Sequence, residues 1–285
     1  RVSMKLLRLL SLFTLIVTPT ISKVQRGIIF GSGRIGSHLF ESNGKVDFLL
    51  TRHDPFPTLI EAESVPIYVC TRNDDLINVV EKVPVHRRND LVFLQNGVLS
   101  TLLKANGLQN ASQALIYYGI AKKNDVPIDG KTELNPEGLT SVTGKWAEDF
   151  SERMKQAGLS CKILEKEKFS QAMLEKHVWI CAFMAIGVKY GVNVGAVEMD
   201  HREEVTQLIR ELARTGSQEL GITLEPGFEA RLCAYAKSVA SFPTALKELK
   251  WRNGWFLDIS ERSVNQGKSD PAPLHSVLMK SLLQK

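Results

Sequence analysis

The sequence predicts an α/β protein in which an N-terminal parallel sheet is followed by a second, mainly α-helical domain. Three observations support this prediction. Short apolar segments alternate with helical segments up to residue 164, a glycine-rich turn follows the first apolar segment, and the strand pattern disappears after residue 166. With 285 residues the chain is long enough for two compact domains.

Strands of the first domain are expected where short apolar segments lie between turn residues. These segments are residues 26–30, 45–50, 66–70, 90–94, 115–121, 138–142 and 160–164. Helices are expected at residues 37–42, 74–82 and 145–157, the last from apolar residues at helical spacing. The charged stretch 165–168 is the expected boundary between a first domain, 24–166, and a second domain, 167–285. In that second domain, residues 169–188, 201–220, 229–239 and 274–283 are expected to be helical.

Composition excludes several functional classes. The chain is 44% hydrophobic and 24% charged, with a net charge of +5, and it has no basic stripe with interleaved aromatic residues. We therefore expect no nucleic-acid partner. The cysteines show no CxxC pairing and no histidine at metal-ligand spacing, so no metal site is expected. These residues, read as free thiols, are Cys70, Cys161, Cys181 and Cys233.

Residues 1–22 have the layout of a signal or targeting peptide. Lys5 and Arg8 precede an apolar run, residues 9–17, which ends at Thr18-Pro19. The run is too short to span a bilayer comfortably, so no stable membrane span is expected. The alternatives are an extra N-terminal helix or sequence from an incorrect gene model. Localisation therefore stays open between the cytoplasm and an organelle.

A GxGxxG motif lies between the first expected strand and the first expected helix. It consists of Gly31, Ser32, Gly33, Arg34, Ile35 and Gly36. In this context the glycines permit a tight turn, close approach of a pyrophosphate and close helix–strand packing, which indicates a Rossmann-type dinucleotide site. The free N–H groups at the helix start would bind the phosphates. The alternative is a glycine-rich turn without a ligand.

Cofactor choice is expected to depend on the end of the second strand, where Thr51 and Arg52 lie. An acidic residue there would accept a hydrogen bond from the ribose 2′-hydroxyl, whereas a cation would bind a 2′-phosphate. The guanidinium of Arg52 suits a phosphate, so we expect NADPH as the cofactor. Asp54 keeps NAD as the lesser alternative, and Arg52 could also be an ordinary solvated loop cation.

Three further segments, together with the glycine motif, resemble the ketopantoate reductase family. The segments are residues 92–98, which contain Asn96-Gly97, residues 175–179, and residues 244–259. The resemblance spans residues 27–283 and places the chain in the wider group similar to 6-phosphogluconate dehydrogenase. It implies an NADP-dependent oxidoreductase acting on CH–OH groups, with 2-dehydropantoate 2-reductase chemistry on a small 2-oxoacid or related carbonyl. A homodimer is also considered.

The resemblance assigns roles to individual residues. It implies that Lys176 is catalytic, and hydride addition to a carbonyl indeed needs a cation that stabilises and protonates the new alkoxide. A lysine at a helix start is otherwise usually a surface residue. By the same resemblance, Asp258 forms the catalytic pair with Lys176 and, with Thr244, orients the substrate. Asn96 contacts cofactor and substrate, and Asn193, one residue out of register with a substrate-binding asparagine of the family, is a further substrate contact.

The chain also departs from the family pattern in its second domain. Ile180 and Met184 stand where ketopantoate reductases carry substrate-binding asparagines, and the interval from Thr244 to Asp258 is two residues longer. The expected pocket is therefore more apolar, which puts ketopantoate itself in doubt. Two alternatives stay open: a dehydrogenase of another hydroxyacid, and a non-catalytic NADP(H)-binding protein whose substrate site has degenerated.

Overall fold

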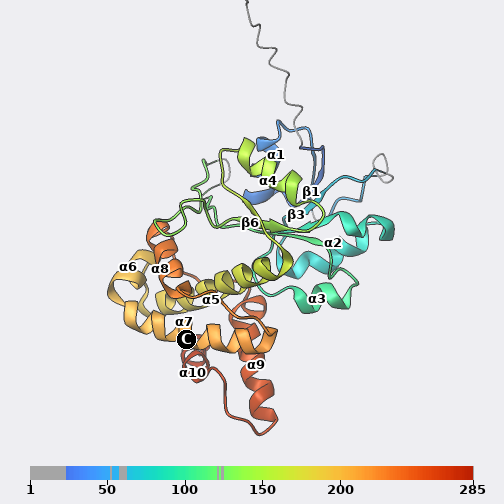
Figure 1. The fold of residues 1–285 in the computed structure, drawn as a ribbon. Coiled ribbons are helices and arrows are strands. Elements are labelled where there is room, and N and C mark those ends of the chain that lie inside the picture. Colours follow the sequence, from blue (N-terminus) through green and yellow to red (C-terminus); the bar gives the residue numbers. More distant parts are fainter. Residues whose placement is uncertain (1–23, 52, 58–62, 121, 123–124, 285) are drawn as a thin grey trace, which may run out of the picture.

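The structure is a computed structural model, and it describes residues 24–51, 53–57, 63–120, 122 and 125–284 (Figure 1). The expected targeting segment 1–22 and the predicted phosphate ligand Arg52 lie outside these residues. The domain division at residue 166 stays a prediction.

The first half of the described chain forms a seven-stranded sheet with the order β2-β1-β3-β4-β5-β6-β7. Strands β1 to β5 are parallel, β6 pairs antiparallel with β5, and β7 is parallel to β6. The strands are β1 Ile28–Phe30, β2 Phe48–Leu50, β3 Ile67–Val69, β4 Leu91–Phe93, β5 Ser112–Leu115, β6 Ser141–Thr143 and β7 Lys162–Ile163. Strands β2 and β3 lie on opposite sides of β1, so the chain reverses direction along the sheet there. In open α/β sheets this is the place where ligands bind, at the carboxyl ends of the strands. The predicted Rossmann-type sheet is confirmed.

Helices cover both faces of this sheet. They are α1 Arg34–Ser42, α2 Leu76–Lys82, α3 Ser100–Ala105 and α4 Ala147–Gln156. Alternate residues of each strand enter different cores: Ile28 and Phe30 pack with residues of α2 and α3, whereas Ile29 packs with residues of α1 and α4. This alternation follows from the two-residue period of a strand. Both faces are buried, as expected of a parallel sheet.

The second half is helical, as predicted, and is built around one long helix, α5 Lys166–Tyr190. The other helices are α6 Val194–Asp200, α7 Arg202–Leu220, α8 Phe228–Ser238, α9 Asn253–Asn265 and α10 Pro273–Leu283. Helix α5 contacts α6, α7, α8 and α10 (Figure 1), so it is buried all round from Leu174 to Phe183. It ends at Gly191, which takes the left-handed conformation (φ 69°) that glycine tolerates best. Among the described residues no single helix could span a membrane; α5 and α6 meet the length and composition criteria only as a pair bent by 85°.

The structure differs from the expected elements in several places. The expected strand 115–121 is wrong, because β5 ends at Leu115 and the described residues after it leave the sheet. Leu115 and Tyr117 pack into the helical core, whereas Ile116, Tyr118 and Ile120 pack against the sheet, which accounts for the apolar character of this segment. Helices α3, α6 and α9 were not expected. Helix α9 starts in an irregular segment, directly after Arg252 with φ −117° and ψ −103°.

A buried ion cluster holds the first half together. The Arg153 side chain on α4 has no solvent exposure, and its Nη1 lies 2.7 Å from Asp47 Oδ2. Its Nε lies 3.1 Å from Asp149 Oδ1, and the Tyr68 hydroxyl also donates to Asp149. Because these residues come from α4, β3 and the start of β2, the cluster ties one helix to two strands.

Candidate functional site

The glycine motif forms a tight turn between β1 and α1. Gly31 has φ +110°, and a Cβ there would lie 2.7 Å from the Cys70 carbonyl carbon. A Cβ on Gly36 would lie 1.8 Å from the Gly31 oxygen, so only glycine lets the helix pack this closely on the turn. A Cβ on Gly33 would meet no atom within 4 Å, so this side of the turn is open. The turn therefore offers an accessible backbone next to the end of β1.

Helix α1 starts without a side-chain cap. Gly33 is its N-cap residue and supplies no side-chain hydrogen bond, which leaves first-turn N–H groups for another acceptor. These groups and the helix dipole favour an anion. The Arg34 guanidinium donates to the Ile120 carbonyl oxygen at 2.8 Å, and the Ser37 hydroxyl donates to the Ser32 carbonyl oxygen at 3.0 Å. The residues of the turn therefore fit a pyrophosphate held by backbone groups.

At the end of β2, Thr51 organises its own loop. Its backbone N–H donates to Asp54 Oδ2 at 2.6 Å, and its hydroxyl accepts from the His53 N–H at 3.3 Å. Hydrogen bonds to the Asp54 carboxylate from the Thr51 backbone N–H, and then from the Thr51 side chain, lower the pKa of Asp54. The Asp54 carboxylate is thus engaged by the loop, and contact of this loop with a ribose stays a prediction.

Polar residues gather at the carboxyl ends of β3 and β4. Gln95 Nε2 donates to the carbonyl oxygens of Val69 at 2.8 Å and Thr71 at 3.1 Å, and Asn73 Nδ2 donates to the Asn96 carbonyl oxygen at 2.9 Å. Gln95 Oε1 and Thr71 Oγ1 are buried without a hydrogen-bond partner. Buried polar atoms without partners are uncommon, so they indicate a place for a ligand or a water.

Residues 248–252 of the second half dock on these loops. Glu248 Oε1 accepts from the Asn73 N–H at 3.1 Å, and Trp251 Nε1 donates to Asp74 Oδ1 at 2.7 Å. A Cβ on Gly97 (φ +108°) would lie 2.6 Å from the Trp251 oxygen. The Asn96-Gly97 turn is therefore pressed against the second half of the chain, next to Arg252.

Lys176 lies on α5 and is only 6% exposed. Its Nζ lies 4.2 Å from the centre of the Tyr117 ring, a cation–π distance. No hydrogen bond or ion pair to a described residue neutralises this ammonium. Burial lowers the pKa of Lys176 to about 7, with a smaller effect from the nearby positive charge of Arg252. A buried lysine that titrates near neutrality can exchange a proton with a ligand.

Arg252 faces the same stretch of α5. Its Nη2 donates to Glu248 Oε2 at 2.7 Å, whereas its Nε is buried without a partner. His177, the neighbour of Lys176, is 1% exposed; its ring stacks on Phe256 at 5.2 Å and meets Trp255 edge-on at 5.3 Å. Burial, followed by the charge of Arg252, lowers the pKa of His177 to about 3. The imidazole is therefore neutral at pH 7 and packs the start of α9 against α5.

The other predicted substrate contacts have structural partners of their own. The Asn193 side chain caps α6 by accepting from the Ala196 N–H at 2.9 Å. The Thr244 hydroxyl donates to the Val192 carbonyl oxygen at 2.6 Å, and its side chain fills the space beside Gly187. These contacts account for both residues without a ligand, so substrate binding by Asn193 and Thr244 stays a prediction.

Asp258 is exposed on α9. The buried residues of that helix are Asn253, Phe256, Ile259 and Ser260. At 100° per residue Asp258 points away from this stripe, and the structure records no contact between Asp258 and Lys176. Ile180 and Met184 pack into the helical core, as their apolar side chains require. Of the predicted catalytic pair, only Lys176 is buried at the interface of the two halves.

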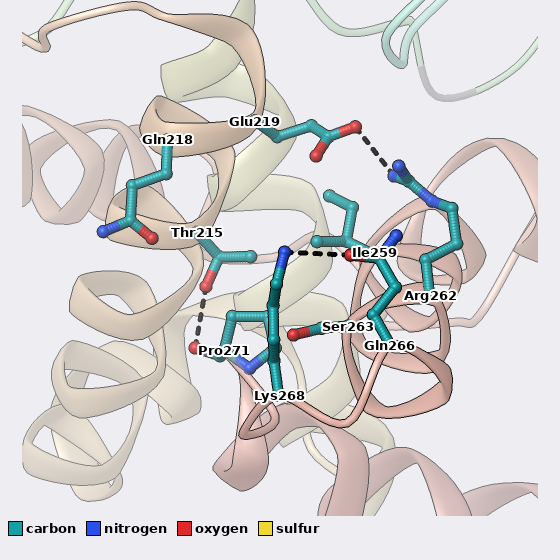
Figure 2. A pocket seen from close by; sticks show the side chains of 9 residues that line it. All are labelled: Thr215, Gln218, Glu219, Ile259, Arg262, Ser263, Gln266, Lys268 and Pro271. Atoms are coloured by element: carbon teal, nitrogen blue, oxygen red, sulfur yellow. Dashed lines mark hydrogen bonds and ion pairs between the residues drawn. The ribbon is translucent and has the colours of Figure 1, made fainter.

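The described pockets do not coincide with this site. One of about 210 Å³ lies between α7, α9 and the loop after α9 (Figure 2), where Arg262 pairs with Glu219 and Lys268 donates to Gln266. Pockets of about 360 and 490 Å³ lie elsewhere, the first beside β6 and β7, the second beside α8. Buried charges and unpartnered polar atoms indicate a functional site more directly than the volume of a pocket does. The described part of the chain holds no group of three or more residues suited to a metal ion.

Several residues of this site were missed from the sequence. Asn73 and Gln95 could have been found from their position after β3 and β4, where ligands bind in open α/β sheets. The sequence gives no comparable signal for Tyr117, Glu248 and Arg252, because only packing between distant segments brings them into this site.

No protein-family model and no curated protein matches the sequence. Solved structures do match. The 2-dehydropantoate 2-reductase from Methylococcus capsulatus has a TM-score of 0.63 and 13% identity, over 91% of this chain and 97% of that chain. The dimeric ketopantoate reductase from Staphylococcus aureus has a TM-score of 0.58 and 17% identity, over 91% and 99%. D-mandelate dehydrogenase, solved with NADH and anilino(oxo)acetate, has a TM-score of 0.61 and 12% identity, over 90% and 99%. The likeness predicted from sequence is thus confirmed at the level of the fold.

Proposed function

We propose, from the fold that this chain shares with ketopantoate reductases, that it is an NADPH-dependent reductase of a small 2-oxoacid or related carbonyl compound. The observation that carries the proposal is the Lys176 ammonium, which is 6% exposed and lies over the Tyr117 ring without a counter-ion among the described residues. A charge buried in this way is costly for stability and is expected where a protein uses it.

The residues of the first half fit a dinucleotide. The turn Gly31–Gly36 would hold the pyrophosphate through backbone N–H groups, and Asn96 would lie beside the nicotinamide. When bound, a reduced nicotinamide supplies a hydride for the carbonyl carbon. The preference for NADPH rests on Arg52 and Thr51 in the sequence, and comparison of NADPH with NADH as reductant tests it directly.

Lys176 would hold the proton that the reduced carbonyl needs. Its ammonium can donate a hydrogen bond to the carbonyl oxygen and pass a proton to it as negative charge develops. The Tyr117 ring holds the ammonium in place without a carboxylate, which would otherwise raise its pKa. Asn96 and Thr244 are proposed to orient the substrate. Asp258 and Asn193 are weaker proposals, because Asp258 is exposed and Asn193 caps α6.

A substitution of Lys176 tests this function. Lys176→Met should reduce turnover of 2-oxoacids by about 100-fold or more, because general acid catalysis contributes roughly 10²–10⁴-fold. The dissociation constant of NADPH should change little. Lys189→Met is the matched control, since Lys189 lies on the same helix but is paired with Glu204 at the surface. Near-normal turnover in Lys176→Met would remove this residue from the mechanism.

A second candidate function is a non-catalytic NADP(H)-binding protein. It is favoured by Ile180 and Met184, which pack into the helical core, and by the exposure of Asp258. Tight NADPH binding without oxidation across a panel of 2-oxoacids, 3-oxoacids and other carbonyl compounds would support it. The same panel distinguishes a 2-oxoacid reductase from a dehydrogenase of another hydroxyacid. Light scattering would test the proposed homodimer.

A further inference from the structure

Arg252 has hydrogen-bonding capacity that the protein does not use. A guanidinium carries five N–H donors. Only one hydrogen bond of the Arg252 side chain to a described residue is found, from Nη2 to Glu248 Oε2. Its Nε is buried and has no acceptor. Such a donor costs stability unless a ligand or water satisfies it.

Packing places this guanidinium near the turn of α5 that carries Lys176 and His177, close enough that, after burial, its charge also lowers the pKa of both side chains. The residue directly before it, Trp251, lies against Gly97, and Glu248 joins it to Asn73 at the carboxyl end of β3. The residues after it, Trp255 and Phe256, contact the ring of His177 on α5. Arg252 is therefore held between the loops after β3 and β4 on one side and the Lys176-His177 turn of α5 on the other.

The charge balance of this place favours an anionic ligand. The ion pair of Arg252 with Glu248 uses only one guanidinium nitrogen, and the nearby carboxylate of Asp74 accepts from Trp251. Lys176 has no carboxylate partner among the described residues. Both side chains of that ion pair are mostly buried, with 15% and 13% exposure. In a site with little water an unbalanced positive charge attracts an anion strongly. Ile180 and Met184 lie one and two turns along α5 from Lys176. Their side chains are apolar, so they cannot bind an anion in place of Arg252.

We propose that Arg252 binds the carboxylate of the substrate while Lys176 contacts its carbonyl oxygen, so that the site selects 2-oxoacids over neutral carbonyl compounds. The proposal rests on the proposed function and names its substrate class. Guanidinium groups suit planar carboxylates because two parallel N–H groups can bind both oxygens. In a 2-oxoacid the carboxylate is bonded directly to the carbonyl carbon, so one small ligand can present a carboxylate to Arg252 and a carbonyl oxygen to Lys176.

The test compares 2-oxoacids with the primary amides of the same acids, which have nearly the same shape but no charge. We suggest 2-oxobutyrate, 2-oxoisovalerate and phenylglyoxylate with their amides, and kcat/KM followed by NADPH absorbance. The wild-type protein should prefer the acids. Arg252→Gln should lower the acid-over-amide ratio by about 30-fold or more, because truncating one partner of a buried charge pair has effects of that size.

Three further variants separate recognition from folding. Arg252→Lys keeps the charge and should recover part of the ratio. Glu248→Gln removes the competing carboxylate but can still accept from Asn73, so it should keep or increase the preference for acids. Arg262→Gln, on the surface of α9, is the matched control and should leave the ratio unchanged. If Glu248→Gln lowers the ratio as much as Arg252→Gln, the pair is structural and the proposal is wrong.

The remaining outcomes are distinguishable. If the wild-type protein reduces amides as well as acids, the carboxylate proposal fails while the reductase function stands. If Arg252→Gln weakens NADPH binding and leaves the acid-over-amide ratio intact, Arg252 binds the cofactor and the proposal is overturned. If no compound is reduced, the proposed function fails, and calorimetry of 2-oxobutyrate against its amide then decides the role of Arg252. Tighter acid binding that Arg252→Gln abolishes would support it, and equal binding would overturn it.

Discussion

Replacing Arg153 by methionine should destabilise the protein severely. Methionine keeps much of the volume of the side chain but removes the charge that serves Asp47 and Asp149. The Arg153 and Asp47 side chains have 0% exposure and that of Asp149 has 5%, so water cannot take over the lost contacts. Two carboxylates would then be buried without their cation, and Asp149 would keep only neutral donors, the Tyr68 hydroxyl and the Gln25 backbone N–H.

The expected cost follows from this burial. Removing one partner of a buried ion pair costs about 3–5 kcal/mol. The total free energy of unfolding of a protein is about 5–15 kcal/mol, so the change is a large fraction of it. With a urea slope of about 2 kcal/mol per M, the midpoint of urea unfolding should fall by about 2 M.

Urea unfolding followed by circular dichroism measures this shift. Arg210→Met is the control: it breaks the ion pair with Glu229, whose side chains are 63% and 31% exposed, and exposed pairs contribute about 0–1 kcal/mol. A midpoint for Arg153→Met as close to wild type as that of Arg210→Met would refute the claim that the buried cluster holds the first half together.

Three other predictions follow from the site. Lys176 must be protonated to act as an acid and its pKa is lowered to about 7, so kcat/KM for reduction should fall about tenfold per pH unit above pH 7. Lys176→Arg, whose guanidinium stays protonated, should lose this inflection in a pH–rate profile. An unchanged inflection would assign the titration to another group. The free energy of unfolding should also depend on pH, because between pH 7 and about 10.5 the Lys176 side chain binds more protons in the unfolded state than in the folded state. The wild-type protein should therefore become more stable as the pH rises through this range. In urea unfolding, Lys176→Met should exceed the wild type in stability most at pH 6–7, and the difference should shrink towards pH 10. A constant difference across this range would contradict the lowered pKa. Gly36→Ala should abolish NADPH binding and lower the melting temperature, because its Cβ would lie 1.8 Å from the Gly31 oxygen. A Cβ at Gly33 would meet no atom within 4 Å, so Gly33→Ala should fold normally and weaken only nucleotide binding, measured by fluorescence titration. Equal melting temperatures for Gly36→Ala and wild type would argue against the tight turn.

The first half could be predicted from the sequence because its signals are local. The strand before Gly31, the turn and the helix after it arrive in order within 17 residues, Arg26 to Ser42, and the two-residue alternation of Ile28, Ile29 and Phe30 fits a sheet covered on both faces. Lys176 could be placed on the first long helix for the same reason. The resemblance, not the pattern, indicated its role.

The rest of the site depends on contacts between distant segments. The segment 115–120 resembles a strand because its side chains alternate between two cores: Leu115 and Tyr117 pack on the helical core, and the residues between and after them pack against the sheet. Glu248 and Arg252 lie in a segment without hydrophobic periodicity, and their partner Asn73 is 175 residues away from Glu248. Asp258 was assigned by its spacing from Thr244, but the helix phase of α9 turns it towards solvent.

The central claim is that this protein transfers a hydride to a carbonyl carbon while Lys176 supplies the proton. Incubation of the wild-type protein with a 2-oxoacid and NADPH that carries deuterium at both C4 positions, followed by mass spectrometry, tests it most directly. The account predicts a 2-hydroxyacid that carries deuterium at C2 with the wild-type protein and at least 100-fold less with Lys176→Met, consistent with the roughly 10²–10⁴-fold contribution of a general acid. Absence of deuterium transfer to any 2-oxoacid, from a protein that binds NADPH, would contradict it.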